Sequence, residues 1–321
     1  MKEHQSITSI LKSTQLPLVL ATLCKKEGPS YRGLGARLVS DGEKILSGSI
    51  SGGCIESDLL TKAREVLQTA QSQLVVYDLR NDTEDPFGYG MGCDGSISVL
   101  LQAPLQYMPY CEAVDLASET RQNIYLATSL IEGSNLGEQR IFYKMPKELH
   151  GLLLEEVTPP IALVLFGGGR DATPLVDLAG LLGWKVYLTD YRKGQLPEDL
   201  QFPWVTTIHG SVQQIMEQVP FDRSTAFVSM THQLKMDIAM VYEVMKTESF
   251  YIGVMGHRDR LRDITLNTLK QDTRLHSPVG LDLGAKEPSQ IALSICSEIL
   301  ALYNGTKGIP LSANDGALPR L

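Results

Sequence analysis

Two cysteines lie among glycines, in positions where a thiol can do chemistry. Gly52, Gly53 and Cys54 stand directly before a predicted helix. Glu56 falls in the first turn of that helix, and Cys93 lies in a second glycine-rich segment. A helix amino terminus lowers the pKa of a nearby thiol, and the thiolate is the form that binds a soft metal centre or accepts sulfur. Both cysteines are therefore candidate metal ligands; the alternative is that each is a small buried hydrophobic residue.

A glycine-rich turn that follows an apolar run forms a second candidate site. It consists of Gly167, Gly168, Gly169, Arg170, Asp171 and Ala172, which fit the pattern G-x-G-x-x-[GA]. Glycines there let phosphate oxygens approach the N–H groups at the start of a helix. Asp190 ends the next predicted strand, about 20 residues on, where an acid bonds ribose hydroxyls. The turn predicts a nucleotide-like, phosphate-bearing ligand, although glycines can also serve only to pack a strand against a helix.

Polar residues beyond two later strands are candidate ligand contacts. Ligands of parallel sheets lie beyond the carboxyl ends of the strands. Thr231 and His232 follow the fourth strand of the second half, and Arg258 follows the fifth. Alternatively, Thr231 caps a helix, His232 is an exposed loop residue and Arg258 belongs to a solvated helix face. Arg192, just beyond Asp190, leaves a 2′-phosphate open as a ligand group.

The second half, residues 151–305, alternates apolar runs with amphipathic segments of helix length. The runs are Ile161–Phe166, Lys185–Thr189, Val205–Ile208, Thr225–Met230 and Phe250–Met255. Repeated strand–helix–strand units predict an α/β fold with a Rossmann-type doubly wound parallel sheet. A last helix is predicted from Pro288 to Tyr303, and residues 306–321 are predicted to be a tail.

The first half, residues 1–150, is predicted to be an α+β domain. Its expected strands are Leu18–Cys24, Arg37–Val39, Leu74–Tyr77 and Ile97–Gln102, with one strong helix at Cys54–Ala70. The domain seam is expected between Leu149 and Pro160, because the Thr-Pro-Pro that ends this stretch continues neither a helix nor a central strand.

Composition limits the classes of protein that fit. A chain of 321 residues suits two domains, and a formal charge of -8 argues against nucleic-acid or anionic membrane partners. The apolar stretches fall short of the roughly 20 residues that span a bilayer. With no secretory signal in the sequence, a cytoplasmic location is expected. The five cysteines contain no C-x-x-C pair, so neither a disulfide framework nor a zinc site is indicated.

Taken together, these segments resemble the XdhC/CoxI family, the accessory factors of xanthine dehydrogenase and related molybdenum hydroxylases. In the first half the resemblance rests on Glu27–Arg32, Gly35–Arg37, the S-G-G-C-I-E string at Ser51–Glu56 and the loop of Cys93. In the second half it rests on Gly167–Ala172, Thr231-His232 with Asp237, Tyr251–Gly253 and Ser277–Ala285, which contains P-V-G-L-D-L-G-A. The S-G-G-C-[IL]-E and P-[IV]-G-L-D-[IL]-G-A strings are specific, and the likeness covers nearly the whole chain.

The resemblance implies a cofactor-binding maturation factor more than a classical enzyme. Members of the family are understood to bind molybdenum cofactor (molybdopterin), to protect it while a terminal sulfido ligand is installed with a cysteine desulfurase, and to hand it to the apo-hydroxylase. The same role and partners are implied here, and we expect a homodimer. Cys54, with Cys93 if the two lie close, is expected to contact the molybdenum end, while a phosphate sits near Gly167–Gly169.

Two other function classes remain open. One is an NAD(P)-dependent oxidoreductase with His232 as proton donor and the first half as its substrate domain. Beyond His232 and Asp237, no acid–base group supports it. The other is a pure interaction protein whose sheet binds no ligand. Separate binding measurements with NAD(H), NADP(H) and molybdopterin discriminate among the three.

Overall fold

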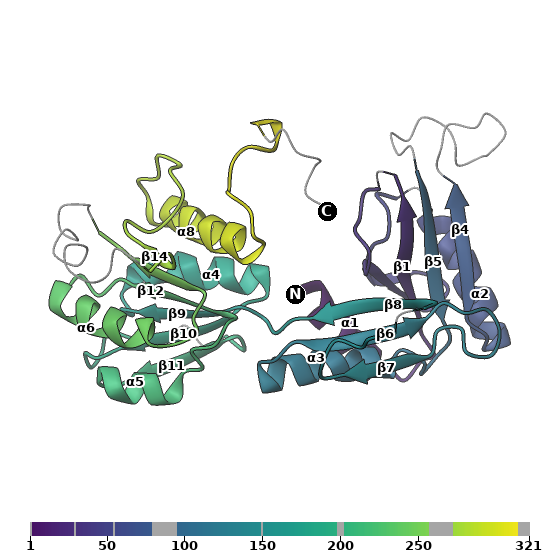
Figure 1. The fold of residues 1–321 in the computed structure, drawn as a ribbon, viewed down its shortest axis with the longest axis horizontal. Coiled ribbons are helices and arrows are strands. Elements are labelled where there is room, and N and C mark those ends of the chain that lie inside the picture. The colour runs from purple at the N-terminus through teal and green to yellow at the C-terminus, as the bar shows by residue number, and fades with distance from the viewer. Residues whose placement is uncertain are drawn as a thin grey trace. The chain divides into compact units, whose positions relative to one another are not determined.

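The computed structural model describes residues 2–28, 30–53, 55–78, 95–148, 150–197, 202–256 and 272–313. They form two compact units, an amino-terminal unit from Glu3 to Pro159 and a carboxy-terminal unit from Pro160 to Ala313 (Figure 1). The division lies at the end of the expected seam, whereas the sequence predicts a boundary at residue 150. The reason is strand β8 (Leu152–Val157), which pairs antiparallel with β6 (Ile124–Ser129) and so belongs to the amino-terminal unit.

A six-stranded parallel sheet organises the carboxy-terminal unit. The strands are β9 (Ala162–Phe166), β10 (Lys185–Asp190), β11 (Val205–His209), β12 (Thr225–Ser229), β13 (Tyr251–Val254) and β14 (Leu275–His276). Their order is β11-β10-β9-β12-β13-β14, so the chain reverses its progress across the sheet between β9 and β12. This is the Rossmann order. The prediction of a doubly wound sheet is confirmed. Of its six strands, only the short β14 was not predicted, because no apolar run marks it in the sequence.

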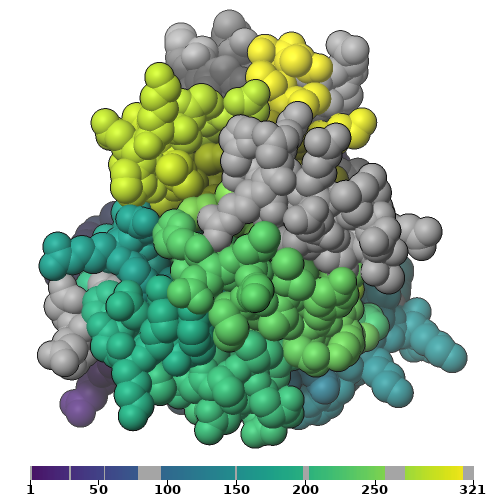
Figure 2. Space-filling model, turned by 90° about the vertical axis from the view of Figure 1, so that its left-hand side faces the viewer, coloured from purple at the N-terminus to yellow at the C-terminus, as the bar shows by residue number. Residues whose placement is uncertain are grey.

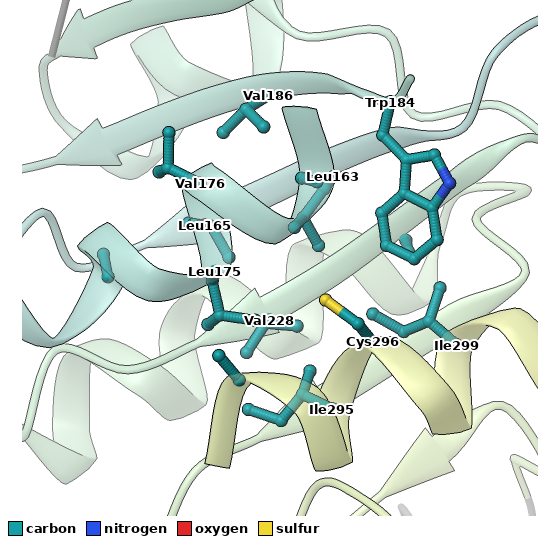
Figure 3. Packing of buried hydrophobic residues seen from close by; sticks show 14 of the residues in the cluster. Leu163, Leu165, Leu175, Val176, Trp184, Val186, Val228, Ile295, Cys296 and Ile299 are labelled. Atoms are coloured by element: carbon teal, nitrogen blue, oxygen red, sulfur yellow. The ribbon is translucent and has the colours of Figure 1, made fainter. Parts of the chain in front are cut away.

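Helices cover both faces of this sheet, which is why its central strands are apolar throughout. They are α4 (Thr173–Leu182), α5 (Val212–Gln218), α6 (Leu234–Met245) and α8 (Pro288–Tyr303). Leu175 of α4 and Ile295 of α8 pack with Leu165 and Val228 of the strands on one face (Figure 3). The residues of α5 and α6 pack on the other face. Figure 2 shows the outside of this unit, with green residues of α6 and yellow-green residues that follow β14 at the surface.

Two antiparallel sheets make up the amino-terminal unit. One has the order β3-β2-β1-β5-β4 and the other the order β7-β6-β8. The remaining strands are β1 (Val19–Glu27), β2 (Arg37–Ser40), β3 (Ile45–Gly48), β4 (Gln73–Asp78), β5 (Ser96–Gln102) and β7 (Gln139–Phe142). The helices are α1 (Lys2–Ser13), α2 (Glu56–Thr69) and α3 (Met108–Thr120). The unit is α+β, as predicted.

Helix α2 follows from its sequence. Leu59, Ala63 and Val66 are spaced to face one side, and all three are buried. The helix ends where Ala70 takes a left-handed conformation and its N–H bonds Val66 O. The predicted helix at Cys54–Ala70 is thus confirmed, with its first helical residue at Glu56. Within the described ranges, no helix combines the length and the apolar character needed to cross a membrane.

Candidate functional site

The glycine-rich turn and the loop of Thr231 and His232 meet at the carboxyl ends of β9 and β12. The two strands are paired, and the Met230 N–H donates to Phe166 O at 2.8 Å just beyond the last pair. Gly167 has φ 122°, and a Cβ there would lie 2.6 Å from the carbonyl carbon of Met230. Only glycine permits this approach of two backbones. The predicted residues of these two loops therefore gather at the switch point, where doubly wound sheets bind ligands.

Asp190 fixes the backbone of the turn through a hydrogen bond. Its Oδ2 accepts the Gly168 N–H at 2.9 Å and Arg192 Nη2 at 2.9 Å, while Oδ1 accepts the backbone N–H and Nε of Arg192. Burial opposes the charged form of this fully enclosed carboxyl, but the bonds from Arg192 and Gly168 outweigh it and keep the pKa of Asp190 below its usual value. The sequence pattern assigns Asp190 to ribose hydroxyls. In the structure a ribose would have to compete with Arg192 for the same oxygens.

The exposed part of the turn begins at Gly169. Gly167 and Gly168 are buried, whereas Gly169 is half-buried and Arg170 is exposed. Among the described residues, no atom lies within 4 Å of the place where a Gly169 Cβ would stand. The chain then enters a short 3-10 turn, η1 (Arg170–Ala172), which leads directly into α4. Free N–H groups at such a start attract anions, so this open surface fits a phosphate group.

Thr231 is buried, and its hydrogen bonds are made inside the protein. Its N–H and hydroxyl both donate to Asp237 Oδ1, at 3.2 and 2.6 Å, and the Ser229 hydroxyl donates to the same oxygen at 2.7 Å. Asp237 lies in the first turn of α6 and is itself buried. The alternative of a helix cap is therefore closer to the observed role of Thr231, although the N-cap residue itself is Gln233. Asp237 is not among the ligand contacts predicted from the sequence, yet an acid in a first helical turn after Ser and Thr is the signal for it.

We expect Asp237→Ala to destabilise the carboxy-terminal unit by about 3 kcal/mol, because three buried donors lose their shared acceptor. Asp237→Asn keeps an oxygen at that place and should cost about 1 kcal/mol or less. Urea unfolding of both variants measures the difference. Equal stability of Asp237→Ala and the unchanged protein would contradict the assignment.

His232 is the predicted contact of this loop that faces outward. Its side chain is 61% exposed, and Nε2 lies 3.4 Å from Asp171 Oδ2 of η1. The backbone of His232 is left-handed, with φ 61°, a conformation that costs energy for a residue other than glycine. The bonds of Asp237 to Thr231 fix the preceding residue in this strained loop. His232 is thus held beside the open end of the glycine-rich turn.

In the amino-terminal unit, Glu56 shapes the turn that precedes Cys54. Glu56 Oε1 accepts the Ser51 N–H at 2.8 Å and Oε2 accepts the Ser51 hydroxyl. Burial opposes the charge, yet these bonds hold the pKa of Glu56 below its ordinary value. Gly52 and Gly53 are exposed, and no atom of the residues that the structure describes lies within 4 Å of their missing Cβ positions. The glutamate therefore acts on the turn, and the two glycines leave its outer side open.

The remaining cysteines behave as apolar core residues. Cys24, Cys111 and Cys296 are buried, and burial raises the pKa of their thiols to about 11, 11 and 12. Thiols with so high a pKa are unreactive near neutral pH. The candidate metal ligands Cys54 and Cys93, and the candidate phosphate contact Arg258, lie outside the described residues. Within the described part of the chain, no group of three or more His, Cys, Asp or Glu side chains is arranged to hold a metal ion.

The strand order, the open turn at the switch point and the separate antiparallel unit define a Rossmann-type two-unit protein, a class that binds its ligands at that point. Residues 163–299 match the family model described as the XdhC Rossmann domain, and residues 11–78 match that of the XdhC and CoxI family. The chain belongs to the XdhC and CoxI family.

Two relatives and one solved structure match along most of their length. A protein named as a probable xanthine dehydrogenase subunit, from Bacillus subtilis (strain 168), is 27% identical over 92% of this chain and 96% of its own. The molybdenum cofactor insertion chaperone PaoD from Escherichia coli (strain K12) is 22% identical over 88% of this chain and 83% of its own. A crystal structure described as a xanthine dehydrogenase from Bacillus halodurans superposes with a TM-score of 0.82 at 27% identity, covering 95% and 97% of the two chains.

Proposed function

We propose that this protein is a maturation factor that binds molybdenum cofactor, supports its sulfuration with a cysteine desulfurase and delivers it to a xanthine dehydrogenase-type apo-enzyme. The observation that carries the proposal is the near full-length relation to proteins named for xanthine dehydrogenase and for molybdenum cofactor insertion, joined to an open anion-binding turn. A homodimer and a cytoplasmic location remain predictions from the sequence.

The phosphate end of the cargo is assigned to the carboxy-terminal unit. Gly169 has open space above it, and η1 and α4 present the start of a helix there. Arg170 is exposed beside the turn, and Arg258 stays a candidate contact. With a net charge of -8 the protein offers no general attraction to phosphate, so local N–H groups and arginines have to supply it.

The molybdenum end is assigned to Cys54 and Cys93. Soft thiolate ligands suit a metal that already carries sulfur from the pterin dithiolene. The support for Cys54 is its place between the open glycines and α2, where the helix start favours a thiolate. The role of Glu56 is to hold Ser51 and so the shape of that turn.

We expect Cys54→Ser and Cys93→Ser each to weaken binding of molybdenum cofactor by about tenfold or more, because a hydroxyl is a poor ligand for a soft metal. Fluorescence or calorimetric titration with purified cofactor measures the loss. Cys24→Ser is the matched control: Cys24 Sγ donates to Ser98 O at 3.1 Å, a bond that serine can keep, so binding should not change. If both Cys54→Ser and Cys93→Ser bind the cofactor fully, the assignment of the molybdenum end is wrong.

An NAD(P)-dependent oxidoreductase is the second candidate, favoured by the exposed His232 beside Asp171 at the ligand edge. Arg192 already occupies both oxygens of Asp190, which disfavours a free ribose there. Titrations with NAD(H) and NADP(H) separate the two functions. Tight dinucleotide binding with hydride transfer would favour the oxidoreductase, and binding of molybdenum cofactor alone would favour the maturation factor.

A further inference from the structure

A cluster of charged side chains outside the candidate functional site surrounds a cavity in the amino-terminal unit. The cavity has a volume of about 200 Å³. It is lined by Glu3 and His4 of α1 and by Arg32 and Arg37, which stand before and at the start of β2. Pockets that enclose a drug-sized ligand measure about 300 to 1,000 Å³. This one therefore suits a small ion, or the charged end of a larger molecule.

We infer that this cavity binds a tetrahedral oxyanion, as free phosphate or as a phosphate monoester, in exchange for the carboxylate of Glu3. Arg32 is the group that an incoming anion reaches, since its side chain is 31% exposed. At present Arg32 Nη2 donates to Glu3 Oε2 at 2.5 Å. A guanidinium that pairs with a carboxylate pairs equally well with a phosphate, because its planar donors match both.

Arg37 supplies a second positive charge, and its contacts fix the position of its guanidinium group. Its side chain is only 2% exposed; Nη1 donates to Gly35 O at 2.8 Å and Nη2 to Glu155 Oε2 at 2.6 Å. The guanidinium carbon lies 4.0 Å from the ring centre of Tyr110. The Nε of Arg37 has no hydrogen-bond partner among the described residues. A buried, fixed charge with a spare donor thus stands beside the more exposed Arg32.

The carboxylate of Glu3, which now pairs with Arg32 in the cavity, is incompletely hydrogen-bonded. Its Oε1 is buried and has no hydrogen-bond partner in the described part of the chain. A buried acceptor without a donor is unfavourable, so the contact of Glu3 with Arg32 is easier to exchange than a fully bonded pair. Glu3 is also the second residue of α1, and helix ends fray.

The pKa of His4, which lines the cavity, depends on the charges around it. Burial, together with the positive charges of Arg37 and Arg32, lowers the pKa of His4 to about 3, so the ring is neutral at physiological pH. Its Nδ1 lies 2.7 Å from the hydroxyl of Tyr110. Burial is the largest cause of this shift, and the charges of Arg37 and Arg32 add to it, so two guanidinium groups stand close to an uncharged ring, an arrangement that favours an anion. A bound anion should in turn raise the pKa of His4.

The test is a titration of the full-length protein with inorganic phosphate, and separately with glycerol phosphate, followed by calorimetry and by the amide NMR signals of Gly33 and Gly35. We expect Arg32→Gln to weaken binding at least about tenfold, because a charge-assisted pair is lost. Glu3→Gln should strengthen it severalfold by removing the competing carboxylate. Arg140→Gln is the control: Arg140 is an exposed arginine of the same unit, paired with Glu138, and should bind as the unchanged protein does.

The signals of Gly168 and Gly169 report separately on the turn of the proposed function, so the two sites fail or succeed independently. Shifts of Gly33 and Gly35 with inorganic phosphate identify the free anion as a ligand, and shifts with glycerol phosphate alone identify an ester; both support the site. Equal affinity of Arg32→Gln and the unchanged protein, or shifts confined to Gly168 and Gly169, would overturn it.

Discussion

Gly169→Asp should weaken binding of molybdenum cofactor by about a hundredfold while leaving the protein as stable as before. The backbone of Gly169 has φ -62° and ψ 169°, and no atom in the described part of the chain lies within 4 Å of the Cβ position, so the side chain fits. Aspartate is favoured before a helical turn, where its carboxylate accepts the free N–H groups. Those are the groups assigned to phosphate. Two negative charges about 4 Å apart repel by roughly 1 to 4 kcal/mol between water and a protein surface.

Gly169→Asn is the matched control, since it has the same shape without the charge. It should bind the cofactor at least about tenfold more tightly than Gly169→Asp. Calorimetric titration gives the affinities and thermal unfolding gives the stabilities. A Gly169→Asp protein that binds as tightly as the unchanged one would place the phosphate elsewhere. Loss of fold in the variant would contradict the open geometry of this position.

Arg37→Met should destabilise the amino-terminal unit by about 3 to 5 kcal/mol. The pair of Arg37 with Glu155 is buried, with the two side chains 2% and 13% exposed. Removing the arginine leaves a carboxylate in the interior without its partner, and that cost exceeds the net worth of the pair. Gly35 makes room for this pair, because a Cβ there would lie 2.6 Å from Glu155 Oε1.

The double variant Arg37→Met with Glu155→Leu separates the causes. If the unpaired charge is responsible, the second change should restore most of the loss. Urea unfolding measures the stabilities, and hydrogen exchange of the β2 amides assigns the loss to this unit. A double variant no more stable than Arg37→Met would instead attribute the loss to packing against Tyr110.

How far sequence predicts the fold depends on burial. The strands from β9 to β13 were predictable because helices cover both faces and make the runs continuously apolar, as at Ala162–Phe166. In the amino-terminal unit β6 and β8 escaped prediction. β8 reads Leu-Leu-Leu-Glu-Glu-Val and stands next to a Thr-Pro-Pro that resembles a linker. Its place in a sheet depends on pairing with β6, a contact that local sequence does not encode.

Part of the candidate site could likewise be predicted from the sequence, and part could not. The turn at Gly167–Gly169 was predictable because the pattern itself expresses the geometry. What surrounds each polar residue was not: Asp190 looks like a ribose ligand until Arg192 is seen bonded to both its oxygens. Thr231 looks like a ligand contact until Asp237, one turn into α6, is seen to accept its hydroxyl. Which partner a polar side chain bonds depends on the neighbours that the fold brings to it, and the local sequence does not show them.

The way Gly167 and Gly168 are held has a consequence for the speed of exchange. One packs on the backbone of Met230 and the other donates to Asp190, so groups on the protein side set the shape of the turn. Under the proposed function, an arriving phosphate would find its donors in place, and no entropy would be spent on ordering a loop at that moment. A carrier that loads and unloads the same molecule gains from such rigidity, because neither step waits for the turn to form.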